Sequence, residues 1–301
     1  DIVANTISLT ADAGGIGTTT TIDVTARTQF NADSANDQSD ILIDGIGDLP
    51  LGLTTAGASG GTLTLDATLA ITDALMMPAV DAGAGAENII GAQANLTAVG
   101  GIGGAGDADI DTSIDGLQAT NSTTGAVVVQ ETDGLIVNGT GVRTLGGNGD
   151  ISIDVDASDL VTDSVVTANG SGDIMLNADA GTTDLNAVTS SGSGNIGVAG
   201  DAVTQDANVT TGGGDVMVDA DTTAVTMADG VVSSAGGGEI GYEALTDVVL
   251  SRLVTTVNDI TVTATMGAIT DNLTLGPDTE NADGAVVTLN AAMGVGDAGG
   301  Q

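Results

Sequence analysis

The sequence predicts an all-β fold, a parallel β-helix (β-solenoid) with about 20–24 residues per coil. Three observations lead to this prediction: a short apolar run recurs after a Gly-rich turn, the chain has almost no aromatic residues, and Gly and Asp separate the apolar runs. The recurring runs begin at residues 151, 174, 196, 216, 240 and 260, so the steps are 23, 22, 20, 24 and 20. A period near this length is typical of stacked-coil architectures.

The first half of the chain contains several short segments with the same character. Apolar and polar residues alternate at the strand period of two in Thr6–Ala11. Strands are also expected at Thr20–Val24, Ile41–Ile43, Asn95–Gly103 and Ala126–Val129. Residues 50–94 follow the pattern least regularly.

The segment from 150 to 265 is the most regular part of the sequence. In each repeat we expect the apolar residues to face the core and the residues between them to face water. Equivalent positions should then stack about 4.8 Å apart along the axis. Two further short strands per coil indicate two or three sheets. The residues expected to face inward are Ile151, Ile153, Val155, Ile174, Leu176, Ile196, Val198, Val216, Val218, Ile240, Tyr242, Ile260 and Val262.

The last segment, Ala285–Ala291 with residues 294–296, repeats the pattern of Thr6–Gly17. We therefore predict one continuous β-solenoid over 1–301. Neither end shows an amphipathic helix or a charged segment that would cap the stack. We expect both ends to continue, in a longer chain or fibre, or through contact with another copy.

Composition limits the core and the chemistry. With one Phe, one Tyr and no Trp, the core must consist of aliphatic residues and be thin. The 47 Gly lie mostly between apolar runs, where we expect turns with positive φ.

The absence of Cys and His removes disulfides, thiolate metal sites and the usual general base. A polysaccharide-lyase-like enzyme would need a basic residue near the scissile bond, and only three scattered Arg are present. We expect no enzyme. Thr does not recur at one coil position, which disfavours an ice-binding surface.

The charge is strongly negative. Three basic residues face 41 acidic ones, for a net charge of −38, and all but five of the acidic residues are Asp. Such a surface disfavours nucleic acid and anionic membranes as partners and favours cations. No apolar run approaches the roughly 20 residues of a membrane span, so we expect no membrane insertion. A chain without Cys or Lys fits the outside of a bacterial cell better than the cytosol.

An acidic or amide residue precedes each apolar run of the regular segment. If the coils stack, these residues form a ladder at one corner, where two carboxylates about 4.8 Å apart repel by about 0.9 kcal/mol in water. Calcium would relieve this repulsion, because it prefers carboxylate and carbonyl oxygens. The favoured alternative is a purely structural role at strand ends, with ordinary salt as the screen. No cofactor is required in either case. The residues of this candidate calcium ladder are Asp150, Asp173, Asp215, Glu239 and Asp259, together with the amide Asn195.

The repeats at 147–153, 170–179 and 96–103 resemble those of the filamentous-haemagglutinin-like repeat regions of large bacterial secreted and surface proteins. This resemblance implies a right-handed parallel β-helix, export, and a role in fibres, adhesion or cell-surface matrices. It transfers no functional residue. We therefore expect a structural repeat protein that self-associates by end-to-end stacking into an extracellular fibre, surface layer or matrix. The alternative is the stalk of a bacterial adhesin that displays a binding module outside this segment.

Overall fold

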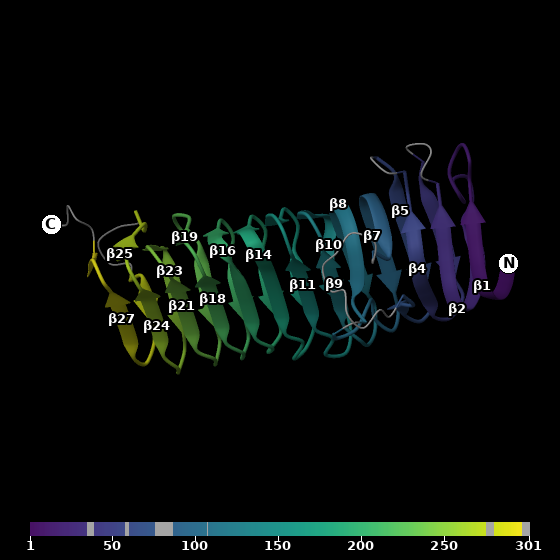
Figure 1. The fold of residues 1–301 in the computed structure, drawn as a ribbon. Coiled ribbons are helices and arrows are strands. Elements are labelled where there is room, and N and C mark those ends of the chain that lie inside the picture. The colour runs from purple at the N-terminus through teal and green to yellow at the C-terminus, as the bar shows by residue number, and fades with distance from the viewer. Residues whose placement is uncertain (35–38, 58–59, 76–86, 107, 275–279, 297–301) are drawn as a thin grey trace. The chain divides into compact units, whose positions relative to one another are not determined.

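The computed structural model describes residues 1–34, 39–57, 60–75, 87–106, 108–274 and 280–296. The fold is all-β, with parallel strands stacked in a β-solenoid of about 12 turns (Figure 1). The predicted fold class is confirmed. The described residues form no helix that is long and apolar enough to span a membrane. The chain divides into two compact units, residues 1–156 and 157–301, which are described separately.

The first unit stacks parallel strands of very different lengths. The longer ones turn a corner of the coil and therefore pair with two strands, as β2 does with β3 and β4. Its strands are β1 (Ile2–Thr10), β2 (Ile22–Asp33), β3 (Ile41–Gly45), β4 (Leu49–Thr55), β5 (Thr62–Ala67), β6 (Ile71–Asp73), β7 (Ile89–Ala98), β8 (Ile110–Asn121), β9 (Val127–Glu131), β10 (Leu135–Thr144) and β11 (Ile151–Val155).

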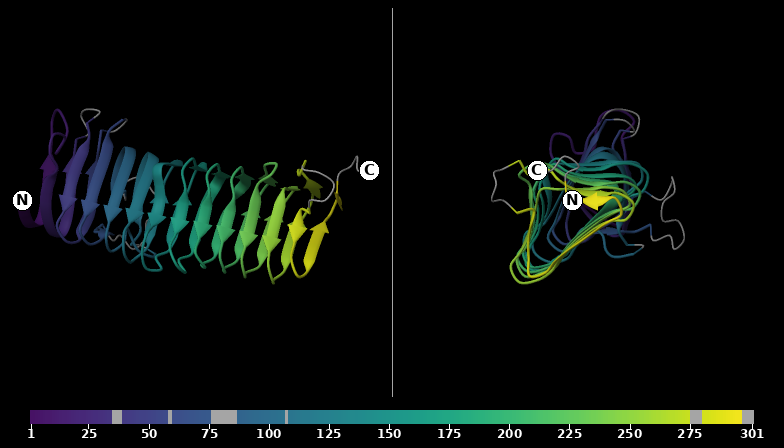
Figure 2. Two further views of the ribbon diagram at one scale, coloured as in Figure 1. Left: turned by 180° about the vertical axis from the view of Figure 1, so that it is seen from behind. Right: turned by 90° about the vertical axis from the view of Figure 1, so that its left-hand side faces the viewer.

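The second unit is more regular, with three strand segments per coil and three parallel sheets. Seen end-on, its green and yellow coils overlie one another as a three-sided outline (Figure 2). Its strands are β12 (Leu160–Thr162), β13 (Val166–Ala168), β14 (Ile174–Leu185), β15 (Thr189–Ser191), β16 (Ile196–Gln205), β17 (Val209–Thr211), β18 (Val216–Ala220), β19 (Val225–Met227), β20 (Val232–Ala235), β21 (Ile240–Ala244), β22 (Val248–Leu250), β23 (Arg252–Thr255), β24 (Ile260–Ala264), β25 (Ala268–Asp271), β26 (Ala282–Asp283), β27 (Val287–Ala291) and β28 (Gly294–Val295).

The register follows the sequence repeat. Ile174 pairs with Ile196, and the ladder continues through residues 216, 240 and 260. All the residues expected to face inward from 151 to 262 are buried, with at most 2% of each side chain exposed. The longest offset between paired residues in the first unit, Thr54 with Ile89, falls in the stretch 50–94 that follows the pattern least regularly. Residues 76–86 of that stretch lie outside the described part of the chain.

The glycines that precede the corner acids have a different role from the one we expected. Turns at Gly147 and Gly230 do have positive φ, 66° and 79°. The repeated Gly194, Gly214 and Gly238 do not, so the expectation is wrong for them. A Cβ atom at Gly214 would lie 2.2 Å from the carbonyl oxygen of Gly194 in the preceding coil. These glycines are needed because the turns stack too closely for a side chain.

Buried hydroxyl groups hold the same turns together. Thr211 Oγ1 donates to the carbonyl of Gly194 at 2.7 Å and accepts the N–H of Gly214 at 3.1 Å. Ser191 makes the equivalent pair of bonds one coil earlier, to the carbonyl of Gly172 and from the N–H of Gly194. One buried hydroxyl therefore satisfies two main-chain groups in adjacent coils, which offsets the cost of burying them.

We predict that Gly214→Ala destabilises the second unit, because the new methyl group would force the turns at Gly194 and Gly214 apart. Overpacking of this kind costs about 1–3 kcal/mol. The matched control is Gly213→Ala, whose Cβ would meet only ordinary contacts, the nearest being Ser193 Cβ at 3.4 Å. Urea unfolding followed by circular dichroism measures both variants. Equal midpoints for the two would contradict the close-packing explanation.

Candidate functional site

The corner that carries the predicted calcium ladder lies immediately before the first strand of each coil in the second unit. Asp173, Asn195, Asp215, Glu239 and Asp259 precede β14, β16, β18, β21 and β24 in turn. The register of these strands brings the five residues together in successive coils. Asp150 occupies the corresponding place before β11 in the first unit, where its carbonyl accepts the N–H of Val127 at 2.8 Å.

The corner side chains take part in the bonding between coils. Asp173 Oδ1 accepts the main-chain N–H of Asn195 at 2.6 Å. Asn195 Oδ1 accepts that of Asp215 at 2.9 Å, and Asp215 Oδ1 accepts that of Glu239 at 2.8 Å. Each side chain thus supplies an acceptor for the equivalent residue of the next coil. An amide serves as well as a carboxylate, so the arrangement has a structural role without a metal.

The same device recurs at other corners of both units. A short Asp or Asn side chain reaches the main-chain N–H of a residue 21–24 positions later, a bond that the additional methylene of Glu would misplace. This accounts for a short side chain at these corners. The pairs are Asp40 with Thr62, Asp48 with Ala70, Asp159 with Thr182, Asn208 with Val232 and Asp247 with Ala268.

A second row of carboxylates, which our sequence reasoning missed, lies on the first unit. Asp23 pairs in register with Asp44, and Asp44 with Asp66. Burial and the charge of Asp44 raise the pKa of Asp66. The signal was present in the sequence as three repeats of an aliphatic residue, Asp and an uncharged residue, at Ile22–Val24, Ile43–Gly45 and Leu65–Ala67.

A shallow depression of about 300 Å³ lies on the outer surface of the second unit. It forms where Gly241 leaves a gap in the outward row and the side chain of Met217 lies across it, with Sδ 2.5 Å from where a Cβ atom would be. Burial, Asp221 and Glu243 raise the pKa of Asp219 beside it. Because every charged residue of its lining is acidic, the depression would attract cations and repel anions. The charged lining residues are Asp219, Glu239, Glu243 and Asp259.

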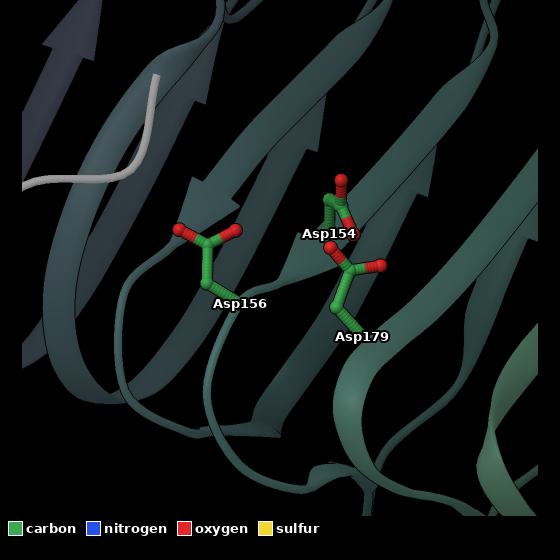
Figure 3. Close-up of side chains that lie close together, drawn as sticks. All are labelled: Asp154, Asp156 and Asp179. Carbon is green, nitrogen blue, oxygen red and sulfur yellow. The ribbon is translucent and has the colours of Figure 1, made fainter. Parts of the chain in front are cut away.

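Figure 3 shows three further aspartates, two from the first unit and one from the second. Asp154 lies in β11 and Asp156 follows it, with Gln130 Nε2 donating to Asp156 Oδ1 at 3.0 Å. Asp179 lies in β14 of the second unit and accepts a hydrogen bond from Asn177 Nδ2 at 2.5 Å. Because the three come from different units, we assign them no common metal site.

Glu131 is the most strongly perturbed acid of the described chain. It is fully buried at the end of β9, where its carboxyl group accepts the N–H of Ile114 at 3.2 Å and lies 2.6 Å from Thr112 Oγ1. Burial raises its pKa to about 9, so the group is protonated at neutral pH. The sequence could have predicted this position. The inward alternation of Val127 and Val129 in β9, continued by two residues, places Glu131 in the core.

Tyr242 shows how the core accommodates a large polar residue. Its hydroxyl group lies 2.6 Å from both Ser233 Oγ and Gln205 Oε1, and Gln205 Nε2 also donates to Ser233 Oγ at 2.9 Å. Burial raises the pKa of the phenol above its usual range. Three side chains from three successive coils thereby satisfy one another inside an aliphatic core.

Comparison with protein-family models, curated proteins and solved structures finds no significant match to this chain. The resemblance to filamentous-haemagglutinin-like repeats therefore stays a prediction.

We predict that Asp215→Asn leaves stability unchanged or slightly raised, whereas Asp215→Ala lowers it. Asn keeps the acceptor for the N–H of Glu239 and removes one charge, as Asn195 does in the preceding coil. Ala leaves that N–H without its partner, at a cost of about 1 kcal/mol. Urea unfolding midpoints at low and high salt measure the two variants. Equal destabilisation by both would contradict the acceptor role.

We predict that Glu131→Gln makes the stability of the first unit less dependent on pH. The folded pKa is about 9 and the ordinary value is 4.5, so the folded state holds a proton that the unfolded chain releases. The stabilising effect of this proton is complete below pH 4.5 and is lost as the pH rises through about 9. Gln at this position can accept from Ile114 and donate to Thr112 at any pH.

The measurement is the unfolding midpoint of wild type and variant at pH 5 and at pH 8. The variant should gain stability relative to wild type at pH 8, and its midpoint should change less between the two values. Asp12→Asn, at an exposed position of the first unit, is the control. If Glu131→Gln changed the pH dependence no more than this control does, Glu131 would not be the buried proton donor.

Proposed function

We propose that this chain is a structural repeat protein that forms an extracellular fibre, surface layer or matrix by end-to-end stacking of solenoid coils. The observation that carries the proposal is the repeated bonding between coils, in which main chain, corner Asp or Asn side chains and buried hydroxyls all join one coil to the next. Each coil is complete only with a neighbour. A protein built in this way extends along one axis by repeating a single kind of contact.

The charge supports a location outside the cell and end-to-end growth. Like charges at −38 per chain keep neighbouring molecules apart laterally, and this repulsion falls as salt concentration rises. Because the chain has no Cys, an oxidising environment can neither form disulfides in it nor oxidise a thiol. Self-association and cations are the partners that this surface favours.

The adhesin stalk is a second proposal, favoured by the position of the aromatic residues. Phe30 and Tyr242, the only aromatics of the chain, are at most 1% exposed. Exposed aromatic side chains are the usual anchors of protein interfaces. A stalk that holds a binding module lying outside this segment needs no such anchor on its own surface.

We predict that the purified chain forms filaments whose length grows with protein concentration. Electron microscopy and light scattering measure this at low and high sodium chloride. Added salt should promote assembly, because it screens the repulsion between acidic molecules. Particles of single-chain size at every concentration and salt level would contradict the fibre proposal. The adhesin stalk would then be the remaining proposal.

Calcium at the corner of Asp150, Asp173, Asp215, Glu239 and Asp259 stays a proposal within this scheme. The same samples test it when a chelator is added before imaging and before thermal unfolding. A lower melting temperature or shortened filaments would support the calcium ladder. If the melting temperature and the filament length did not change, these side chains would act only through their hydrogen bonds.

A further inference from the structure

Two exposed methionines on the outer face of the second unit each lie across a glycine of the next coil. Met175 pairs in register with Gly197, and its thioether sulfur lies 3.0 Å from where a Cβ atom of that glycine would be. Met217 pairs with Gly241 and lies across it in the same way. The two methionines are 51% and 46% exposed. The same uncharged gap, covered by a thioether, therefore occurs twice on this face.

The two gaps differ in the residues that flank them along the chain. Gly241 has Glu239 and Glu243 two positions away on either side. At the same two positions, Gly197 has an amide, Asn195, and an alanine. Of the two gaps, the one at Gly241 alone has a carboxylate at both ends.

A second carboxylate from a neighbouring coil lies at each acidic end. Asp219 pairs in register with Glu243. Asp259 lies beside Glu239, because the two residues directly precede β24 and β21, which pair with each other. Neighbouring positions of adjacent coils are about 4.8 Å apart, so one ammonium group can contact both carboxylates of a pair. All four carboxylates line the depression of about 300 Å³, which is large enough for a small organic ligand.

The depression therefore has two charged ends and an uncharged middle. The ends lie about 13 Å apart, because Glu239 and Glu243 are separated by four residues at about 3.3 Å each. The floor between them is formed by Met217, Gly241 and Thr261. A single inorganic cation contacts one end only. Calcium prefers at least six oxygen ligands, whereas the two carboxylates of one end supply four.

A linear amine with a positive charge at each end fits this arrangement better than an inorganic ion does. Its ammonium groups match the two pairs of carboxylates, and its methylene groups match the uncharged floor. The thioether of Met217 is flexible and polarisable, so it can adapt to a methylene chain that lies along it. The acidic residues around the depression also raise the local concentration of cations.

We propose that this depression binds a linear aliphatic polyamine across β18, β21 and β24. One terminal ammonium group lies between Asp219 and Glu243, and the other lies between Glu239 and Asp259. The chain of methylene groups lies along Met217. Extended spermidine, whose amines are separated by three and four methylene groups, is close to the required length. The site belongs to a single chain and does not depend on fibre formation.

Isothermal titration calorimetry with spermidine at low salt tests the site. Wild type should bind one spermidine per chain in a saturable step. Gly241→Thr should bind it at least about fivefold more weakly, because the new side chain fills the gap while the net charge stays the same. The matched control is Gly197→Thr, which fills the gap without acidic ends and should bind as wild type does. Equal affinities for all three proteins, or uptake that does not saturate, would overturn the proposal.

A charge variant keeps the test decisive if circular dichroism shows that Gly241→Thr does not fold. Glu243→Gln removes one carboxylate of the depression and should weaken spermidine binding about fivefold. Asp206→Asn removes one carboxylate at an exposed position of the same unit outside the depression, and should weaken binding less than about twofold. Equal effects of the two variants would show that spermidine responds only to the overall charge, which would overturn the site.

The length of the ligand gives an independent test at constant ligand charge. A diamine with eight methylene groups can reach both ends of the depression, whereas one with three cannot, although both are dications at neutral pH. The longer diamine should bind at least about fivefold more tightly. Equal affinities would contradict a site with two ends. Calcium chloride that displaces the longer diamine at a lower concentration than the diamine itself would assign the depression to an inorganic cation and overturn the proposal.

Discussion

The structure depends on one constraint, that each coil must match the next in register. In a parallel ladder, every main-chain N–H and C=O of a coil finds its partner in a neighbouring coil, so no coil is stable by itself. The corner glycines allow the close approach, with no room for a Cβ between Gly194 and Gly214. The hydroxyls of Ser191 and Thr211 then join the turns that the glycines bring together. The core contributes aliphatic area, but the fit at the corners fixes which residue stacks on which.

The same register causes repulsion between carboxylates, because an acidic residue that repeats from coil to coil stacks on another acidic residue. Several features limit the repulsion. Corner carboxylates accept main-chain N–H groups, and an amide, Asn195, interrupts their row. On the outer face the row from Asp219 through Glu243 ends at a neutral residue, Thr263. Burial raises the pKa of Asp66, Asp184 and Asp219, and the charge of nearby acids adds to this rise, so some repulsion persists.

Much of the fold could be predicted because the repeat and the strand alternation are two periodicities that reinforce each other. They correctly placed the inward row from Ile174 to Val262 and the register of its strands. Other features escaped prediction, and three of them show why. The role of Gly214 depends on the distance between coils, which the sequence does not contain. The corner acids were assigned to the right place, but their bonds to the next main chain require coordinates. The buried position of Glu131 was readable from the alternation, yet an acid in a core contradicts the usual preference for exposed charge.

The central claim is that corner side chains bind the main chain of the following coil, and hydrogen exchange tests it most directly. The amides of Asn195, Asp215 and Glu239 have side-chain oxygens of the preceding coil as their acceptors. Measured by nuclear magnetic resonance, these three amides should exchange as slowly as those of Ile196 and Val216, which lie within the sheet. Exchange at the rate of unprotected amides, while the strand amides stay protected, would contradict the claim.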